Sequence, residues 1–192
     1  SVLLLDQDRF PSSTLSTHLF FTDSMDVFEH IGVLERVLAV DAPRLRRLKF
    51  PYVEAPFAER NGRDFALCIR RETLDAILVN AAGADPHIEL RTGTRVTGLL
   101  WEDGRASGVR LRPVGSRDEA EVAGRVIIGA DGRNSLVARE VGAAAYHEVP
   151  PLFAWYYGYF GGVPLDDPPS AMAARLASYP AVGADYGASF VF

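Results

Sequence analysis

Apolar residues recur along this chain with two periods, one typical of helices and the other of strands. The clearest helical period begins at Arg70-Arg71, where apolar residues recur at i, i+3, i+4 and i+7, and it closes at Gly83. These apolar residues are Leu74, Ile77, Leu78 and Ala81. Shorter helical patterns predict helices near 23–31, 34–38, 136–141 and 171–176.

Short apolar runs bounded by turn residues predict strands. Asp103-Gly104 is a hairpin signal, and Gly115-Ser116 is a second turn, so the runs between Thr94 and Val122 predict a three-stranded antiparallel meander. Asn61-Gly62 predicts another hairpin turn. Further strands are predicted at 2–5, within 44–50, at 88–90 and at 189–192.

The stretch from Arg125 to Arg139, RVIIGADGRNSLVAR, combines a strand, a glycine turn and a helix. The run 126–128 is β-branched, as expected of a strand buried on both faces of a parallel sheet. Gly129 and Gly132 then flank a turn that carries Asp131, and Ser135 offers an N-cap for the helix. Open α/β sheets bind ligands at the carboxyl ends of their strands, so this turn is a candidate binding site.

Composition narrows the classes of function. The 192 residues are long enough for a sizeable core, with 48% hydrophobic and 23% charged residues as in ordinary globular proteins. The net charge of −5 gives no electrostatic reason to expect nucleic acid or an anionic membrane as a partner. The single cysteine, Cys68, excludes an internal disulfide framework and fits a reducing compartment, so we expect a cytoplasmic protein without a membrane span.

Two charged residues stand where predicted elements end or begin. The strand at 2–5 ends in Asp6, and dinucleotide folds use a carboxylate at such a position to bind a ribose hydroxyl. The alternative is that Asp6 caps a turn. Arg71 opens the long helix, where a cation opposes the helix dipole and a bound anion would offset the mismatch; a surface arginine is the alternative.

In their order along the chain, the strand-end acid, the arginine-led helix, the hairpin and the GADG turn resemble the FAD-dependent monooxygenase family. This is the aromatic-hydroxylase type, and it includes geranylgeranyl-reductase-like oxidoreductases. The resemblance implies an α/β fold, an incomplete Rossmann-like FAD-binding domain with an inserted three-stranded β-meander. Part of a β-rich (α+β) substrate domain would complete the chain.

The resemblance also implies a division of the chain. The FAD-binding domain would take residues 1–42 and 67–148, and the substrate domain 43–66 and 149–192. The family's GxGxxG loop is expected before Ser1 and its GD motif after Phe192, so we expect an internal piece of a longer protein.

The family's cofactor contacts carry over to seven residues. Asp131 would contact the ribityl or pyrophosphate region of FAD, and the glycines beside it would allow close approach. Arg71 would lie near the pyrophosphate, and Asp6 would bind the ribose. The backbone of Val96 would lie against the adenine, and Ser135 would hold the turn. The implied cofactor-binding residues are therefore Asp6, Arg71, Val96, Gly129, Asp131, Gly132 and Ser135.

The implied function is a FAD-dependent oxidoreductase, an NAD(P)H-dependent flavoprotein monooxygenase that hydroxylates a hydrophobic or aromatic organic substrate. A geranylgeranyl-reductase-like enzyme acting on an isoprenoid or other alkene is the alternative. Two further possibilities remain open: a nicotinamide-only Rossmann dehydrogenase and a catalytically inert piece. The protein is also a possible homo-oligomer. The aromatic run from Phe153 to Phe160 either lines a substrate pocket or packs a sheet. No catalytic residue is assigned, and the four histidines lack metal-ligand spacing.

Overall fold

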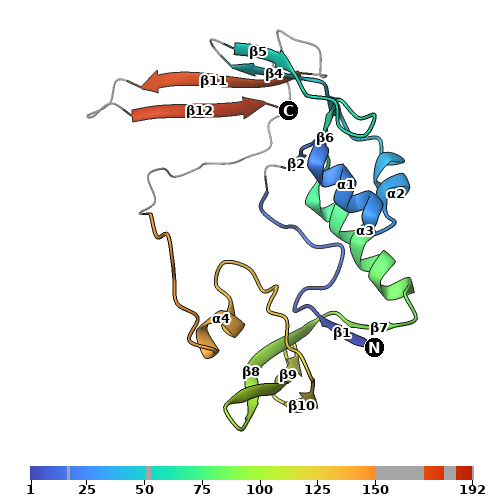
Figure 1. Ribbon diagram of the computed structural model, residues 1–192, viewed down its shortest axis with the longest axis vertical. Helices are drawn as coiled ribbons and strands as arrows, with labels where there is room; N and C mark the ends of the chain where they lie inside the picture. Colours follow the sequence, from blue (N-terminus) through green and yellow to red (C-terminus); the bar gives the residue numbers. More distant parts are fainter. Residues whose placement is uncertain (17, 51–52, 150–170, 180–184, 192) are drawn as a thin grey trace. The chain divides into compact units, whose positions relative to one another are not determined.

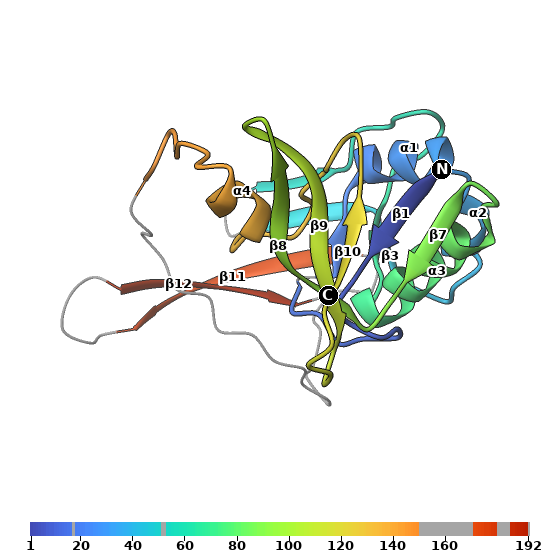
Figure 2. The same cartoon turned by 90° about the horizontal axis from the view of Figure 1, so that it is seen from below.

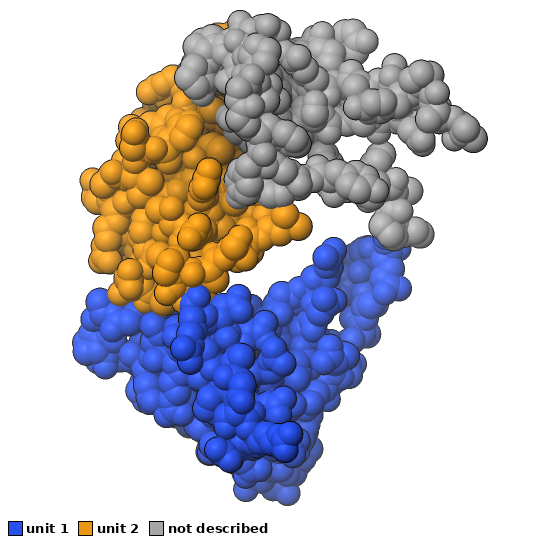
Figure 3. Space-filling view, turned by 180° about the vertical axis from the view of Figure 1, so that it is seen from behind, with its two compact units in different colours: residues 1–9, 83–159 blue, residues 10–82, 160–192 orange. Residues whose placement is uncertain are grey.

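The computed structural model describes residues 1–16, 18–50, 53–149, 171–179 and 185–191 (Figure 1). The chain divides into two compact units, which Figure 3 colours separately. The first unit comprises residues 1–9 and 83–159, and the second comprises 10–82 and 160–192. The predicted aromatic run at 153–160 lies outside the described residues.

The first unit contains a parallel strand pair and an antiparallel meander, which Figure 2 shows from below. The pair is β1 (Val2–Leu5) with β7 (Ile88–Arg91), in a register that sets Leu3 opposite Glu89. The meander is β8 (Thr94–Glu102), β9 (Arg105–Pro113) and β10 (Ala120–Ala123), in the order β10-β9-β8. These strands and the meander confirm the sequence predictions.

The core of the first unit lies on one face of the meander. Leu99, Val109 and Leu111 are buried there. Partly buried side chains pack against them from the rest of the unit: Leu5, Val96, Ala106, Val122, Ile127 and Val137. Among these, Val137 belongs to the short helix α4 (Leu136–Glu140). The cluster therefore joins β1, the meander and the start of α4 through shared apolar contacts.

The second unit packs three helices around a small sheet. The helices are α1 (Thr22–His30), α2 (Leu34–Leu38) and α3 (Arg71–Ala84), whose last two residues pass into the first unit. The sheet has the order β2-β6-β3, with β2 (Leu19–Phe20), β6 (Ala66–Cys68) and β3 (Arg44–Leu45). Its core is formed by Met25, Phe28, Val33, Leu34, Val37, Phe65, Leu67, Ile69 and Leu74.

A second sheet of this unit has the order β12-β11-β4-β5. It combines β4 (Arg47–Phe50) and β5 (Val53–Pro56) with β11 (Ala171–Tyr179) and β12 (Asp185–Val191). β11 pairs in parallel with β4 and antiparallel with β12. The strand predicted at the end of the chain is thus confirmed as β12.

The helix predicted at 171–176 is wrong, because this segment is strand β11. Its alanines favour a helix locally, but pairing with two neighbouring strands supplies backbone hydrogen bonds that outweigh a weak propensity. The end of the long helix also differs slightly. Gly83 lies inside α3, which continues to Ala84.

The strand predicted at 126–128 is wrong as well. These residues carry no strand assignment, and no described strand pairs with them. Ile127 packs on the meander, whereas Val126 is 76% exposed and Ile128 is 84% exposed. A β-branched run becomes a strand only when a neighbour takes up its backbone groups, and the described residues provide no neighbour here.

Burial of Val37 in the second unit should show in stability. Val37 is 0% exposed, whereas Val27 in the preceding helix is 57% exposed. We expect Val37→Ala to lower the free energy of unfolding by about 2 kcal/mol, because it removes fully buried methyl groups. Val27→Ala, the same chemical change at an exposed helical position, should change it by less than about 0.5 kcal/mol. Denaturant unfolding followed by circular dichroism measures both, and equal effects would contradict this core.

Candidate functional site

The GADG turn of the first unit is held together by the carboxylate of Asp131. One of its oxygens accepts the Ser135 hydroxyl at 2.5 Å, and the other accepts the backbone N–H of Leu136 at 2.6 Å and of Val137 at 3.2 Å. The Ser135 hydroxyl oxygen in turn accepts the N–H of Ala138 at 2.9 Å. Asp131 and Ser135 therefore cap α4 together, and the predicted N-cap role of Ser135 is confirmed.

These hydrogen bonds affect the ionisation of Asp131. The bond from Ser135 is the largest cause that lowers the pKa of Asp131, and the backbone N–H groups of α4 add to it. The carboxylate is thus negatively charged at neutral pH, and its cap on α4 weakens only as the pH falls through this lowered pKa. Its side chain is exposed, so solvent screens the charge.

The two glycines of the turn have different reasons to be glycine. A Cβ on Gly129 would lie 2.6 Å from the Cβ of Val137, so α4 approaches the turn closely only because no side chain is present. Gly132 has open space around it but a φ of +78°, a backbone conformation that residues with a side chain rarely adopt. The turn is therefore specified by packing at Gly129 and by backbone conformation at Gly132.

Asp6 lies where β1 ends beside the start of β8. Its carboxylate accepts the backbone N–H of Asp8 at 2.8 Å, which is the turn-capping role considered from the sequence. Its backbone carbonyl accepts the N–H of Thr94 at 2.8 Å. A carboxylate can accept several hydrogen bonds, so capping this turn leaves acceptor capacity for a ligand hydroxyl.

The backbone of Val96 points to the edge of β8 that faces away from β9. The Gly93 carbonyl accepts the N–H of Val114 next to β9, whereas the Thr94 N–H points to Asp6, away from β9. Successive residues of a strand direct their backbone groups to opposite edges, so Val96 directs its N–H and C=O to the edge where Asp6 lies. β8 is the edge strand of the meander. Val96 therefore lies on the edge of β8 where the Thr94 N–H meets the backbone carbonyl of Asp6.

One apolar cluster brings the candidate residues of the first unit together. The buried residues of the meander are contacted by Leu5, which precedes Asp6, and by Val96 itself. Ile127 before the GADG turn and Val137 after it pack against the same buried residues. Six of the seven residues predicted to bind the cofactor are thus organised around this core. The seventh, Arg71, belongs to the second unit and is described there.

Arg71 is the first residue of α3 and is paired within its own helix. Its Nε donates to the Asp75 carboxylate at 2.8 Å, and Asp75 is buried. The guanidinium carries five N–H donors, and this bond uses one of them. The cation at the helix start is therefore balanced partly by Asp75, while its remaining donors are available for an anion.

His18 is a buried residue that no sequence motif singles out. It is 7% exposed, and its Nδ1 accepts the backbone N–H of Arg71 at 3.1 Å. Burial, followed by the nearby Arg70 and Arg71, lowers the pKa of His18 below its ordinary value of 6.5. Nothing in the sequence links a histidine to a helix that starts so much later in the chain.

Glu140 is a second residue that the sequence did not single out. Its Oε2 accepts the backbone N–H of Leu99 at 2.9 Å, beside an irregularity in the pairing of β8 with β9. This bond ties the end of α4 to the edge of the meander. Capping at one end and Glu140 at the other thus fix α4, and with it the GADG turn.

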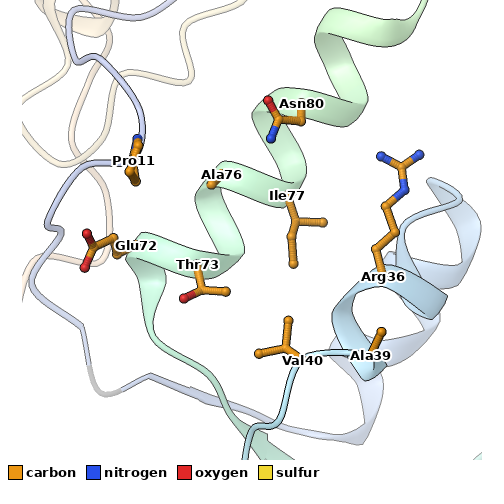
Figure 4. A pocket seen from close by; sticks show the side chains of 9 residues that line it. All are labelled: Pro11, Arg36, Ala39, Val40, Glu72, Thr73, Ala76, Ile77 and Asn80. Atoms are coloured by element: carbon orange, nitrogen blue, oxygen red, sulfur yellow. The ribbon is translucent and has the colours of Figure 1, made fainter.

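The second unit contains a groove of about 560 Å³ along α3, shown in Figure 4. Apolar side chains from α3 and the end of α2 form much of its wall, and Arg36, Glu72 and Asn80 supply polar groups. None of the seven predicted cofactor residues lines this groove.

A metal site, a reactive thiol and a membrane span each require particular residues, and the described part of the chain bears on all three. No group of three or more histidine, cysteine or carboxylate side chains in it could hold a metal ion. Burial raises the pKa of the Cys68 thiol, which disfavours the reactive thiolate. No helix among these residues is long and apolar enough to cross a membrane.

The chain matches the family described as "FAD binding domain" over residues 1–171. Because this match spans most of the 192 residues, the chain belongs to that family. Digeranylgeranylglycerophospholipid reductase from Methanosarcina acetivorans is 38% identical over 84 residues, which are 44% of this chain and 20% of that protein. The corresponding reductase from Methanosarcina mazei gives the same values. The chain thus spans about a fifth of the length of these curated relatives.

Solved structures support the fold. PqsL, described as a probable FAD-dependent monooxygenase from Pseudomonas aeruginosa, matches with a TM-score of 0.63 and 19% identity, over 78% of this chain and 41% of that chain. The flavin-dependent monooxygenase PieE, solved with FAD and substrate, matches with a TM-score of 0.59 and 21% identity, over 73% and 27% of the two chains. The expected Rossmann-like FAD-binding fold and family resemblance are confirmed.

In the first unit, Asp6 and Val96 offer hydrogen-bonding groups that suit the adenosine end of FAD. FAD carries a ribose with hydroxyl donors and an adenine whose edge forms main-chain hydrogen bonds. Asp6 offers the acceptor, and Val96 directs its backbone N–H and C=O to the same edge of β8. Asp131 fits less directly, because three donors of its own chain already engage its carboxylate.

Removing the Asp131 carboxylate should loosen α4. We expect Asp131→Ala to lower the free energy of unfolding by about 1 kcal/mol, as for loss of a helix N-cap. Amide hydrogen exchange at Leu136 and Val137 should become faster, because both N–H groups lose their acceptor. Asp118→Ala is the matched control, since this exposed carboxylate accepts the Ser116 hydroxyl within a loop and caps no helix. Unchanged exchange in Asp131→Ala would contradict the cap.

Proposed function

We propose that the full-length protein binds FAD and is a FAD-dependent oxidoreductase, an NAD(P)H-dependent flavoprotein monooxygenase acting on a hydrophobic or aromatic substrate. The family match over residues 1–171 is the observation that carries this proposal. The monooxygenases among the similar structures support the oxygen-dependent reaction. When bound, FAD would take electrons from NAD(P)H and deliver them to oxygen or to the substrate.

The residues of this chain would bind and orient the cofactor. The Asp6 carboxylate would accept a ribose hydroxyl, and the Val96 backbone would pair with the adenine. Arg71 would direct its remaining guanidinium donors at the pyrophosphate. Gly129 and Gly132 would let the GADG backbone approach the ligand.

Asp131 and Ser135 would act at the same turn in two ways. Their hydrogen bonds to α4 hold the turn in shape, as described above. Any remaining acceptor capacity of the Asp131 carboxylate would serve the ribityl or pyrophosphate region. We also retain the proposed division into a FAD-binding domain at 1–42 and 67–148 and a substrate domain at 43–66 and 149–192.

A flavin-dependent reductase of an isoprenoid or other alkene is the second candidate. It is favoured by the 38% identity to the Methanosarcina reductases over 84 residues. The two reactions differ in their need for oxygen. A monooxygenase places an atom of ¹⁸O₂ in its product, whereas a reductase converts its substrate under anaerobic conditions with reduced flavin.

The full-length protein should purify yellow with noncovalently bound FAD. Its visible spectrum should show flavin bands, and heating should release FAD into the supernatant, where chromatography identifies it. NAD(P)H should bleach the bound flavin, and air should restore it. A colourless preparation that ignores added FAD but binds NAD would instead favour a nicotinamide-only dehydrogenase.

Substitutions at Asp6 should separate its ligand role from its turn role. We expect Asp6→Ala to weaken FAD binding by about 10- to 100-fold, the loss of one charge-assisted hydrogen bond. Asp6→Asn keeps an acceptor for the Asp8 N–H, so it should preserve the turn and give an intermediate affinity. Asp8→Ala removes a neighbouring carboxylate and should leave the affinity unchanged.

Quenching of flavin fluorescence during titration of the apoprotein measures these affinities. Wild-type affinity in both Asp6 variants would show that this carboxylate only caps a turn. Equal losses of FAD affinity in Asp6→Ala and Asp8→Ala would show that affinity depends on the net charge of this region. The assignment of Asp6 to the ribose would then be abandoned.

A further inference from the structure

We propose that His18 is a positioning residue that fixes the start of α3 and thereby orients Arg71 toward the anionic group it binds. The inference rests on the proposed function, which places the FAD pyrophosphate at Arg71. It concerns a residue outside the seven predicted cofactor contacts, and it assigns a role to a buried histidine that the site has not used.

His18 makes two hydrogen bonds across the junction between β6 and α3. Its backbone carbonyl accepts the N–H of Ile69 at 2.9 Å, and its side-chain Nδ1 accepts the N–H of Arg71 at 3.1 Å. The two donors lie on either side of Arg70. The main chain and the side chain of His18 therefore bind the residues on both sides of Arg70, where the chain passes from β6 into α3.

The conformation of His18 fits this double role. Its φ is +60°, in the left-handed region that residues with a side chain seldom adopt. The next residues, Leu19–Phe20, form β2, which pairs with β6 immediately before the junction. A left-handed residue at the entry to β2 is a local cost that the hydrogen bonds to Ile69 and Arg71 help to offset.

α3 needs an acceptor from elsewhere because its own start provides none. The Arg70 carbonyl accepts the N–H groups of Thr73 and Leu74, so Arg70 occupies the N-cap position. An arginine side chain has donors but no acceptor and cannot cap a helix N-terminus. The N–H of Arg71, the first residue of the helix, is one of the donors that have no partner within α3, and His18 accepts it.

Burial and the charges at this junction favour the neutral form of His18. Arg70 and Arg71 are the charged groups that act on it, and Asp75 on the next turn of α3 is paired with Arg71. Nδ1 can accept the Arg71 N–H only when its lone pair is free, which assigns the remaining ring proton to Nε2. Protonation would convert the acceptor into a donor facing a backbone N–H, beside two arginines.

The same bond excludes a direct catalytic role through Nδ1. That atom is engaged with the backbone of α3, and the ring is buried. His18 would therefore act on a ligand through Arg71. Its loss should weaken anion binding by an amount typical of one neutral hydrogen bond, about 3- to 10-fold.

Two amide variants of the full-length protein test this role. In His18→Asn the side-chain oxygen can occupy the place of Nδ1, so the cap is kept without a titratable ring. In His18→Gln the amide reaches the position of Nε2, and the acceptor for Arg71 is displaced. Arg71→Ala tests the pyrophosphate assignment independently of His18.

FAD affinity in a pH series that descends from pH 8 is the first readout, and amide hydrogen exchange at Arg71 and Thr73 is the second. At pH 8 we expect His18→Asn to bind FAD like the wild type and His18→Gln to bind it about 3- to 10-fold more weakly, with faster exchange. Along the descending series the wild type should lose affinity and protection relative to His18→Asn once the pH passes below the folded pKa of His18. The folded pKa is lowered, so the loss develops below the ordinary value of 6.5.

The outcomes separate this inference from the function on which it rests. If the wild type binds FAD and Arg71→Ala weakens binding, but His18→Gln matches His18→Asn in both readouts, the positioning role is wrong and the function stands. If the wild type does not bind FAD, the function fails, and the inference fails with it. If His18→Gln does not fold, the pH dependence of the wild type against His18→Asn decides, and identical profiles would overturn the proposal.

Discussion

The backbone N–H groups at the start of a helix have no partner within that helix, and this constraint shapes one helix start in each unit of the protein. α4 is capped from the preceding turn by Asp131 and Ser135. α3 begins at two arginines and takes its acceptor from His18. In each case the acceptor decides which neighbouring side chains remain available to a ligand. At α4 the cap occupies the turn's own carboxylate, whereas at α3 the arginine keeps most of its donors.

Much of the fold could be predicted from local sequence. The DG hairpin, the strand at 2–5 and the periodicity of α3 are short-range signals, and each appears in the structure. Ser135 could be recognised as an N-cap because it directly precedes its helix. The bond from His18 to Arg71 could not be predicted, because the two residues meet only after β2 and β6 have paired.

The two wrong elements have opposite causes. At 171–179 an alanine-rich sequence that favours a helix forms a strand because it has two neighbours. At 126–128 a sequence that favours a strand remains without a strand partner in the described chain. Both show that strand formation depends on what lies alongside a segment. The alternating burial of Val126, Ile127 and Ile128 still follows the period of an extended chain.

The pairing of β1 with β7 has a consequence for how the protein is made. β1 is among the first residues of the chain, yet its partner strand begins at Ile88. On a ribosome, residues 10–82 of the second unit would emerge before β7. β1 therefore cannot pair with β7 until this whole intervening segment has been made. Such long-range pairing raises the contact order of the first unit and favours its slow folding.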